Sequence, residues 1–303
     1  MAEGLLQQHL GENILNRPPT AERVIKGIGY ACLDATLDAT NPFVRNQYDF
    51  DEGFYRGDFE FQSPLTGETV TSTPETYGRH RVVSALLDST DGRGAPSTVL
   101  DLGCGTLDVA RIIPEAQTGQ LNLLNADISG PWSSGDGNSA LERGTDKLLA
   151  DARGQGNSIF NVQYDFNQSE WPFTEGSLDY IVSNMALHHI DPEQKLNMLK
   201  AMHGSLKENG AVILTDVFSK DESGARFTQA GLRGPEECGG HMVSVSEFVK
   251  MADEAGFQLD TNARTLMHES RNYQDANELT HSMNEVHATM AINKAIWFLE
   301  LRK

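Results

Sequence analysis

The sequence predicts an α/β fold in which helices cover both faces of a doubly wound, mostly parallel sheet, and three observations favour it. First, the stretch TVLDLGCGT at residues 98–106 joins a short apolar run to two glycines, which is typical of a buried strand ending in a tight turn. Second, further apolar runs alternate with segments of helical spacing from there to residue 301. Third, several of these runs end in aspartate or asparagine, at the place where open α/β sheets bind their ligands.

The residues ahead of this sheet predict a cap of helices and a hairpin. Apolar residues in 1–45 recur at helical spacing, and a Pro-Pro pair separates two pieces. Aromatic and acidic residues crowd 46–73, where alternating segments flank the turn sequence SPLTG, so we expect a hairpin. The hairpin either packs on the core or forms a lid over a substrate pocket. We expect two domains, a cap at 1–90 and a ligand-binding domain at 91–303.

The elements of the second domain follow from the hydrophobic pattern. After a helix at 77–87, strands are expected at 98–102, 121–128, 159–164, 178–183, 211–217, 257–267 and 295–301. Helices are expected at 107–113, 140–152, 193–206, 244–255 and from 273 onward. Asn209 and Gly210 predict a turn before the fifth strand, and Gly256 predicts the left-handed residue that ends a helix.

The glycine turn predicts a ligand that carries positive charge. Gly103 and Gly105 let the backbone approach a ligand where a Cβ atom would collide. A dinucleotide site requires a third glycine where this chain has Asp108, and a carboxylate there would repel a pyrophosphate. Asp101, two residues before the first glycine, favours a cationic ligand instead.

At these residues the chain resembles the class I S-adenosylmethionine-dependent methyltransferases, whose first motif reads much like VLDLGCGT. The family more often has glycine in place of Leu107. The resemblance covers residues 98–218 and implies a seven-stranded Rossmann-like sheet with an antiparallel last strand. It also implies S-adenosyl-L-methionine as the cofactor. Residues 239–257 and the segment from Tyr273 are similar to the malonyl-carrier-protein methyltransferase branch, whose layout an arginine-hydroxylating assembly factor shares.

The resemblance implies a set of cofactor-binding residues at successive strand ends. Asp127 would accept hydrogen bonds from both ribose hydroxyls, and Asp165 would accept one from the adenine amino group. A single aspartate at a strand end is more often a cap or turn residue. The prediction therefore rests on the occurrence of the whole set, in this order, at successive strand ends. The implied set consists of Asp101, Gly103, Cys104, Gly105, Asp127, Ile128, Asp165, Phe166, Asn184 and, from the preceding helix, Tyr77.

Histidines at the same rim are the candidates for a catalytic base. A sulfonium methyl group is already activated, so the enzyme has mainly to align it with the acceptor, and a base is needed for a hydroxyl or ammonium acceptor. His189 is the preferred base, His241 the second, and His188 is a further candidate, although each histidine alone is better explained as structural. Asp216 faces the same rim in this interpretation. Arg226 and Arg233 either bind an acidic substrate or belong to a solvated loop.

Composition limits the partners. The net charge of −19 and the lack of a Lys/Arg cluster argue against nucleic acid and anionic membranes. No apolar run approaches the length of a membrane span, the first residues do not resemble a secretory signal, and 3 cysteines form no disulfide pattern, so a cytoplasmic protein is expected. No His, Asp or Glu cluster has the spacing of metal ligands. The oligomeric state stays open.

Three functions follow from these features. The first is methyl transfer from S-adenosyl-L-methionine to a small molecule, most plausibly at oxygen. The second is a hydroxylase or cyclase that binds the cofactor on the same fold without using its methyl group. The third is a non-catalytic assembly factor, which the acidic composition and the N-terminal helices favour and the intact motif residues oppose.

Overall fold

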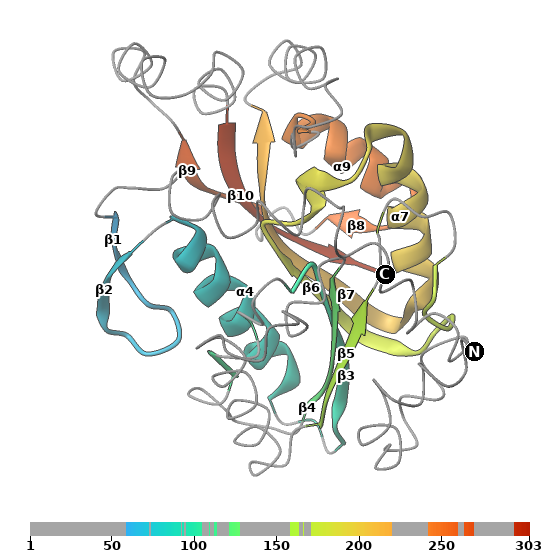
Figure 1. Ribbon diagram of the computed structural model, residues 1–303, viewed down its shortest axis with the longest axis horizontal. Coiled ribbons are helices and arrows are strands. Elements are labelled where there is room, and N and C mark those ends of the chain that lie inside the picture. Colours follow the sequence, from blue (N-terminus) through green and yellow to red (C-terminus); the bar gives the residue numbers. More distant parts are fainter. Residues whose placement is uncertain are drawn as a thin grey trace, which may run out of the picture.

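The computed structural model describes residues 59–72, 74–91, 93, 95–104, 109, 112–113, 121–127, 158–163, 166, 171–219, 242–259, 264–269 and 294–303. The centre of the molecule is a sheet with strand order β5-β4-β3-β6-β7-β10-β8, and β9 pairs with β10 (Figure 1). Parallel pairing joins β5 (Ser158–Gln163), β4 (Leu121–Asp127), β3 (Ser97–Leu102), β6 (Leu178–Asn184) and β7 (Leu206–Ser219). The last strand, β10 (Lys294–Arg302), runs antiparallel to β7, so the predicted α/β sheet with an antiparallel last strand is confirmed.

The central strands β3, β4 and β6 form here because they carry buried side chains on both faces of the sheet. Every residue of β3 is buried, as expected for a central parallel strand that helices cover on both sides. Alternate residues pack in opposite layers: Val99 packs with α4 (Pro74–Thr90), whereas Leu100 packs with α7 (Pro192–Ser205) and α9 (Val245–Glu254). The chain order reverses between β3 and β6, where β4 lies on one side of β3 and β6 on the other.

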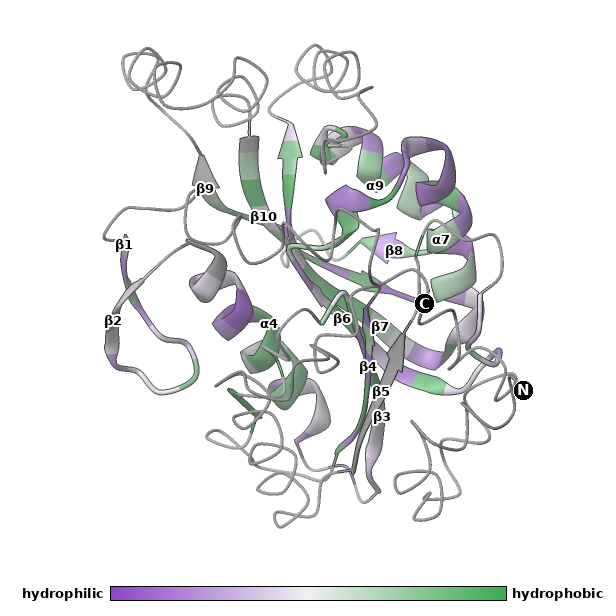
Figure 2. Cartoon of the chain, viewed as in Figure 1, coloured by the Kyte–Doolittle hydropathy of each residue, from purple (hydrophilic) through white to green (hydrophobic). Residues whose placement is uncertain are grey.

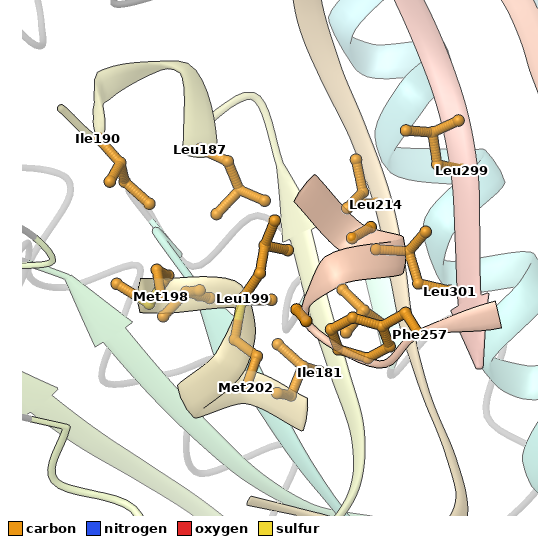
Figure 3. Close-up of a cluster of buried hydrophobic side chains, with 14 of the residues drawn as sticks. Ile181, Leu187, Ile190, Met198, Leu199, Met202, Leu214, Phe257, Leu299 and Leu301 are labelled. Atoms are coloured by element: carbon orange, nitrogen blue, oxygen red, sulfur yellow. The ribbon is translucent and has the colours of Figure 1, made fainter. Parts of the chain in front are cut away.

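The two helical layers bury different apolar faces. In α4 the hydrophobic residues gather in the second half of the helix, beside the sheet (Figure 2), and Val82, Val83 and Leu86 are fully buried there. On the opposite face α7 and α9 cover a larger cluster (Figure 3). That cluster includes Ile181, Leu187, Ile190, Met198, Leu199, Met202, Leu214, Phe257, Leu299 and Leu301.

The predicted hairpin is confirmed and is anchored on α4. It consists of β1 (Phe59–Gln62) and β2 (Thr69–Ser72) in antiparallel pairing. The ring of Phe61 lies 4.9 Å from that of Tyr77 and 5.5 Å from that of His80, between centroids. The Ser63 hydroxyl is hydrogen-bonded to Nδ1 of His80 at 2.8 Å. The hairpin therefore covers the first turns of α4, and its role as a lid stays a prediction.

Two sequence predictions in the second half of the sheet are wrong in detail. The strand expected at 257–267 is two strands, β8 (Gln258–Leu259) and β9 (Thr265–Glu269), which pair with different parts of β10. The turn expected at Asn209 is a bulge inside β7. Leu206 lies opposite Leu178 and Ala211 lies opposite Tyr180, so β7 has extra residues between these two pairs. Within this bulge Asn209 adopts the left-handed backbone conformation, with φ of 64°.

The ends of α9 follow the sequence prediction. The Ser244 hydroxyl accepts a hydrogen bond from the Glu247 amide at 3.1 Å, which caps the first turn. Gly256 follows the helix with φ of 101°. The helices expected in 1–45, at 140–152 and from 273 onward lie outside the described residues, and the domain boundary at 90 stays a prediction.

Candidate functional site

The chain bends sharply where β3 ends, at the carboxyl edge of the sheet. The amides of Gly103 and Cys104 both donate to the carbonyl oxygen of Ala126, at 2.8 and 3.3 Å, so the turn is tied to the end of β4. Gly103 has φ of 75°, a conformation that L side chains rarely adopt. This turn lies at the reversal of strand order, where open α/β sheets bind their ligands.

Gly103 leaves no room for a side chain. A Cβ atom at this position would lie 2.1 Å from Cβ of Ala186 and 3.5 Å from Cε2 of Phe166. Ala186 follows β6, and Phe166 follows β5 in the sequence, so the bend brings segments from three strand ends into contact. The absence of a side chain at Gly103 therefore permits the segment after β6 to pack directly against the bend.

Two aspartates lie on neighbouring strands beside the bend. Asp101 pairs with Asn125 in the β3–β4 register, and Asp127 is the last residue of β4, two positions further on. Residues two apart on a strand share a face, so both carboxylates belong to the face that α4 covers. They are 1% and 5% exposed respectively, and burial of a carboxylate is costly unless hydrogen bonds or charges compensate it.

The first turns of α4 lie against the ends of β6 and β7. The Thr215 hydroxyl donates a 2.6 Å hydrogen bond to Oδ1 of Asn184. A Cβ atom on Gly78 would lie 2.8 Å from that hydroxyl oxygen and 3.0 Å from the same Oδ1. Gly78 therefore permits the close approach of α4, and its neighbour Tyr77 is brought to the same edge of the sheet.

After β6 the chain enters a second constrained turn. Met185 has φ of 57° although it is not glycine, and its amide donates to the carbonyl of Thr215 at 2.8 Å. Non-glycine residues in this region cost of the order of 1 kcal/mol and concentrate at functional sites. The 3₁₀ turn η2 (Leu187–His189) follows and carries the two adjacent histidines.

One of these histidines is paired with a buried carboxylate. Nδ1 of His188 lies 2.6 Å from Oδ1 of Asp216, and the His188 amide donates to Oδ2 at 3.0 Å. A carboxylate accepts hydrogen bonds, so Nδ1 is the protonated ring nitrogen and Nε2 of the neutral ring remains an acceptor. The ring of His189 lies 4.1 Å from that of His188 at an interplanar angle of 40°.

A buried lysine lies on the other side of the same turn. Nζ of Lys195, in α7, donates to the carbonyl oxygens of Leu187 at 2.8 Å and Ile190 at 2.5 Å. Burial lowers the pKa of Lys195 from 10.5 to about 8, against the opposing effect of the carboxylates of Asp216, Asp191 and Glu247. The ammonium group thus remains the main form at neutral pH, at a cost to folding.

This depressed pKa predicts a pH-dependent stability. Between pH 8 and 10.5 the unfolded chain holds a proton on Lys195 that the folded chain has lost, so the free energy of unfolding rises with pH. We expect this contribution to reach about 3 kcal/mol by pH 10.5, because each pKa unit corresponds to about 1.4 kcal/mol. Urea unfolding of the wild type and of Lys195→Met at pH 7.5, 9 and 10.5 measures the difference. A constant difference across this range would contradict the prediction.

The structure brings part of the predicted set together. Gly103, Cys104 and Phe166 surround one bend, although the Cys104 side chain is buried in the core and leaves only its backbone for a ligand. Asp101, Asp127, Asn184 and Tyr77 lie on the neighbouring strand ends and on α4. The remaining predicted residues, Gly105, Ile128, Asp165, His241, Arg226 and Arg233, lie outside the described residues.

Three features of the site were missed from the sequence. The pairing of His188 with Asp216 joins positions 28 residues apart, and no local pattern indicates it. Lys195 reads as an ordinary solvated residue near the start of a helix. Gly78 did carry a signal, since a glycine inside a helical segment indicates a close approach of another backbone or side chain.

The described part of the chain contains neither a candidate membrane-spanning helix nor a candidate metal-binding cluster. No helix there is long and apolar enough to cross a membrane. No group of three or more His, Cys, Asp or Glu side chains in those ranges is arranged to hold a metal ion.

The chain is similar to known methyltransferases. Residues 77–262 match a family model described as a methyltransferase domain. An uncharacterized methyltransferase of Staphylococcus carnosus (strain TM300) is 25% identical over 175 residues, which cover 57% of this chain and 70% of that protein.

Two solved structures align more distantly. Phosphoethanolamine N-methyltransferase 2 of Haemonchus contortus, in complex with S-adenosyl-L-methionine, has a TM-score of 0.47 and 17% identity, over 73% of this chain and 52% of its own. Mycolic acid cyclopropane synthase CmaA1 has a TM-score of 0.47 and 16% identity, over 72% and 82%.

Proposed function

Because the chain belongs to the methyltransferase domain family and is an S-adenosylmethionine-dependent methyltransferase, we propose that it methylates a small molecule at an oxygen atom. The single observation that supports an acceptor which must lose a proton is the hydrogen bond between His188 and Asp216, and a hydroxyl group is the acceptor of this kind that we propose. A hydroxyl group has to lose its proton as it accepts a methyl group, and an imidazole held by a carboxylate is suited to take that proton.

The residues at the carboxyl edge fit the cofactor. Gly103 permits the sharp bend where β3 ends, at the reversal of strand order, and Asp127 would supply a carboxylate that accepts from two neighbouring hydroxyls of a ribose. Asp101 places a second negative charge beside the bend, which favours a cationic sulfonium. When bound, S-adenosyl-L-methionine supplies an already activated methyl group, so the protein contributes mainly alignment.

His188 takes the role of general base in this proposal, in place of His189, which the sequence alone favoured. Asp216 holds His188 by two contacts, one to the ring and one to the backbone amide, so the ring has a defined tautomer and position. Nε2 of His188 is then the atom that accepts the proton of the hydroxyl acceptor. The His189 ring lies against this ring in a tilted arrangement.

Product analysis tests the proposed reaction. Purified protein is incubated with a metabolite extract and cofactor labelled in the methyl group, and both labelled products and S-adenosylhomocysteine are measured. We expect S-adenosylhomocysteine to form in proportion to a labelled methyl ether or ester. Cofactor binding without S-adenosylhomocysteine would support the non-methylating enzyme, and a melting temperature unchanged by cofactor would support the assembly factor.

Substitution of Asp127 tests the cofactor site. We expect Asp127→Ala to weaken binding of S-adenosyl-L-methionine about 100-fold, because two hydrogen bonds to a charged acceptor contribute about 3 kcal/mol together. Isothermal titration calorimetry gives the affinity, and circular dichroism checks the fold. Asp253→Ala, an exposed aspartate of α9, is the matched control and should bind as the wild type does. Equal affinity of the two variants would rule out Asp127 as a ribose ligand.

A further inference from the structure

Lys195 is the most unusual charged residue of the described structure outside the proposed chemistry. Its side chain lies in α7 and is 3% exposed. A lysine buried to this degree loses the hydration of its ammonium group, and an apolar side chain would be cheaper to bury at the same place. Packing alone therefore does not explain an ammonium group here.

The two acceptors of Lys195 flank the histidine pair. The carbonyl of Leu187 precedes His188 directly, and the carbonyl of Ile190 follows His189 directly. The side chains of Leu187 and Ile190 point into the core beside Met198 (Figure 3), while one ammonium group binds both of their carbonyl oxygens. The lysine thus fixes both ends of the short segment that carries the histidines.

Strand β7 of the sheet also holds the 187–190 segment. Asp216, in β7, binds the ring and the amide of His188, and its Oδ1 also accepts from the amide of Val217 at 2.7 Å. Asp216 is the first of the carboxylates that act on the charge of Lys195, ahead of Asp191 before α7 and Glu247 in α9. Lys195, Asp216 and His188 therefore form one electrostatic group, in which the ammonium offsets the buried carboxylate.

We propose that Lys195 is a positioning residue for methyl transfer: it clamps the 187–190 segment and balances the charge of Asp216, and so holds the His188 ring in its working tautomer. This inference rests on the proposed role of His188. Lys195 itself touches neither substrate nor cofactor in this scheme. Its contribution is expected in the turnover number and in the state of the His188 ring, with no direct effect on cofactor affinity.

The test compares Lys195→Met with Lys200→Met, an exposed lysine of the same helix that pairs with Glu254. We expect Lys195→Met to lower kcat about 20-fold, with KM and Kd for the cofactor within twofold, and Lys200→Met to match the wild type. Lys195→Arg keeps the charge and is expected to recover at least a third of the lost activity. Nitrogen-15 NMR of labelled histidine follows the ring directly, with the His188 signal identified by its loss in His188→Gln.

The NMR signature separates positioning from general destabilisation. In the wild type we expect His188 to be protonated at Nδ1, and in Lys195→Met we expect both tautomers. An unchanged tautomer with unchanged kcat would overturn the proposal, as would a loss confined to cofactor affinity. If Lys195→Met does not fold, the wild type is titrated from pH 7 to 10, where loss of the Lys195 proton should shift the His188 signal near pH 8. Absence of that shift would also overturn it.

The same data distinguish failure of this proposal from failure of the proposed function. If His188→Ala keeps full activity, His188 is not the base, whereas the tautomer measurement still decides whether Lys195 holds the ring. If His188→Ala is inactive and Lys195→Met is indistinguishable from the wild type in both readouts, the base assignment stands and the positioning role fails.

Discussion

Replacement of Gly103 with alanine is expected to lower the free energy of unfolding by about 4 kcal/mol and to remove measurable cofactor binding. The new Cβ atom would lie 2.1 Å from Cβ of Ala186, far inside van der Waals contact, so the ends of β3 and β6 would have to separate. Overpacking of this kind costs about 1–3 kcal/mol, and φ of 75° adds about 1–2 kcal/mol for an L side chain. Urea unfolding and calorimetric titration with S-adenosyl-L-methionine measure the two effects.

Two further variants separate the collision from the backbone strain. Gly176 also has positive φ, 61°, but nothing lies within 4 Å of the position of its Cβ atom, so Gly176→Ala should cost only about 1 kcal/mol and leave binding intact. The double variant Gly103→Ala with Ala186→Gly removes the colliding atom and is expected to recover most of the lost stability. If the double variant is no better than Gly103→Ala, contact with Ala186 is not the reason why position 103 requires glycine.

The centre of the sheet could be predicted because local sequence determines it. The run from Thr98 to Leu102 is apolar on both faces, and only a strand covered by helices on both sides satisfies that pattern. The bend after it follows from two glycines in close succession. The helix α9 was equally clear, since a serine cap and a terminal glycine mark both of its ends.

The irregular edge of the sheet could not be predicted in the same way. One strand was expected from Phe257 to Met267, yet β8 and β9 pair with β10 at separate places. Their pairing depends on the register of β10, which begins at Lys294, 25 positions after β9 ends at Glu269. The bulge at Asn209 likewise depends on how β7 meets β6, and the local Asn-Gly pattern indicated only a turn.

The sequence predicted histidines at the edge of the site, but it did not predict which of them is paired with Asp216. Two adjacent histidines after β6 indicated a base, and His189 was preferred, although no local pattern distinguishes it from His188. The ranking depends on which ring reaches Asp216, and this follows from the 3₁₀ turn that Lys195 and the apolar core hold in place. Long-range contacts therefore decide which of two neighbouring and chemically identical residues is paired with a carboxylate.

Substitution of His188 is expected to lower kcat about 1000-fold for the acceptor identified with labelled cofactor. A general base contributes about 100- to 10,000-fold to a proton transfer, and a hydroxyl acceptor at neutral pH requires one.

Asp216→Asn should lower kcat about 100-fold, because an amide can present a donor to Nδ1 and thereby favour the other tautomer. Since the pair acts as a unit, the double variant should be no slower than His188→Ala alone. His189→Ala, which removes the ring beside His188, is the comparison variant, with an expected loss near tenfold. If His189→Ala is the slower of the two single histidine variants, the base assignment returns to the residue that the sequence alone favoured, and Asp216 has a structural role.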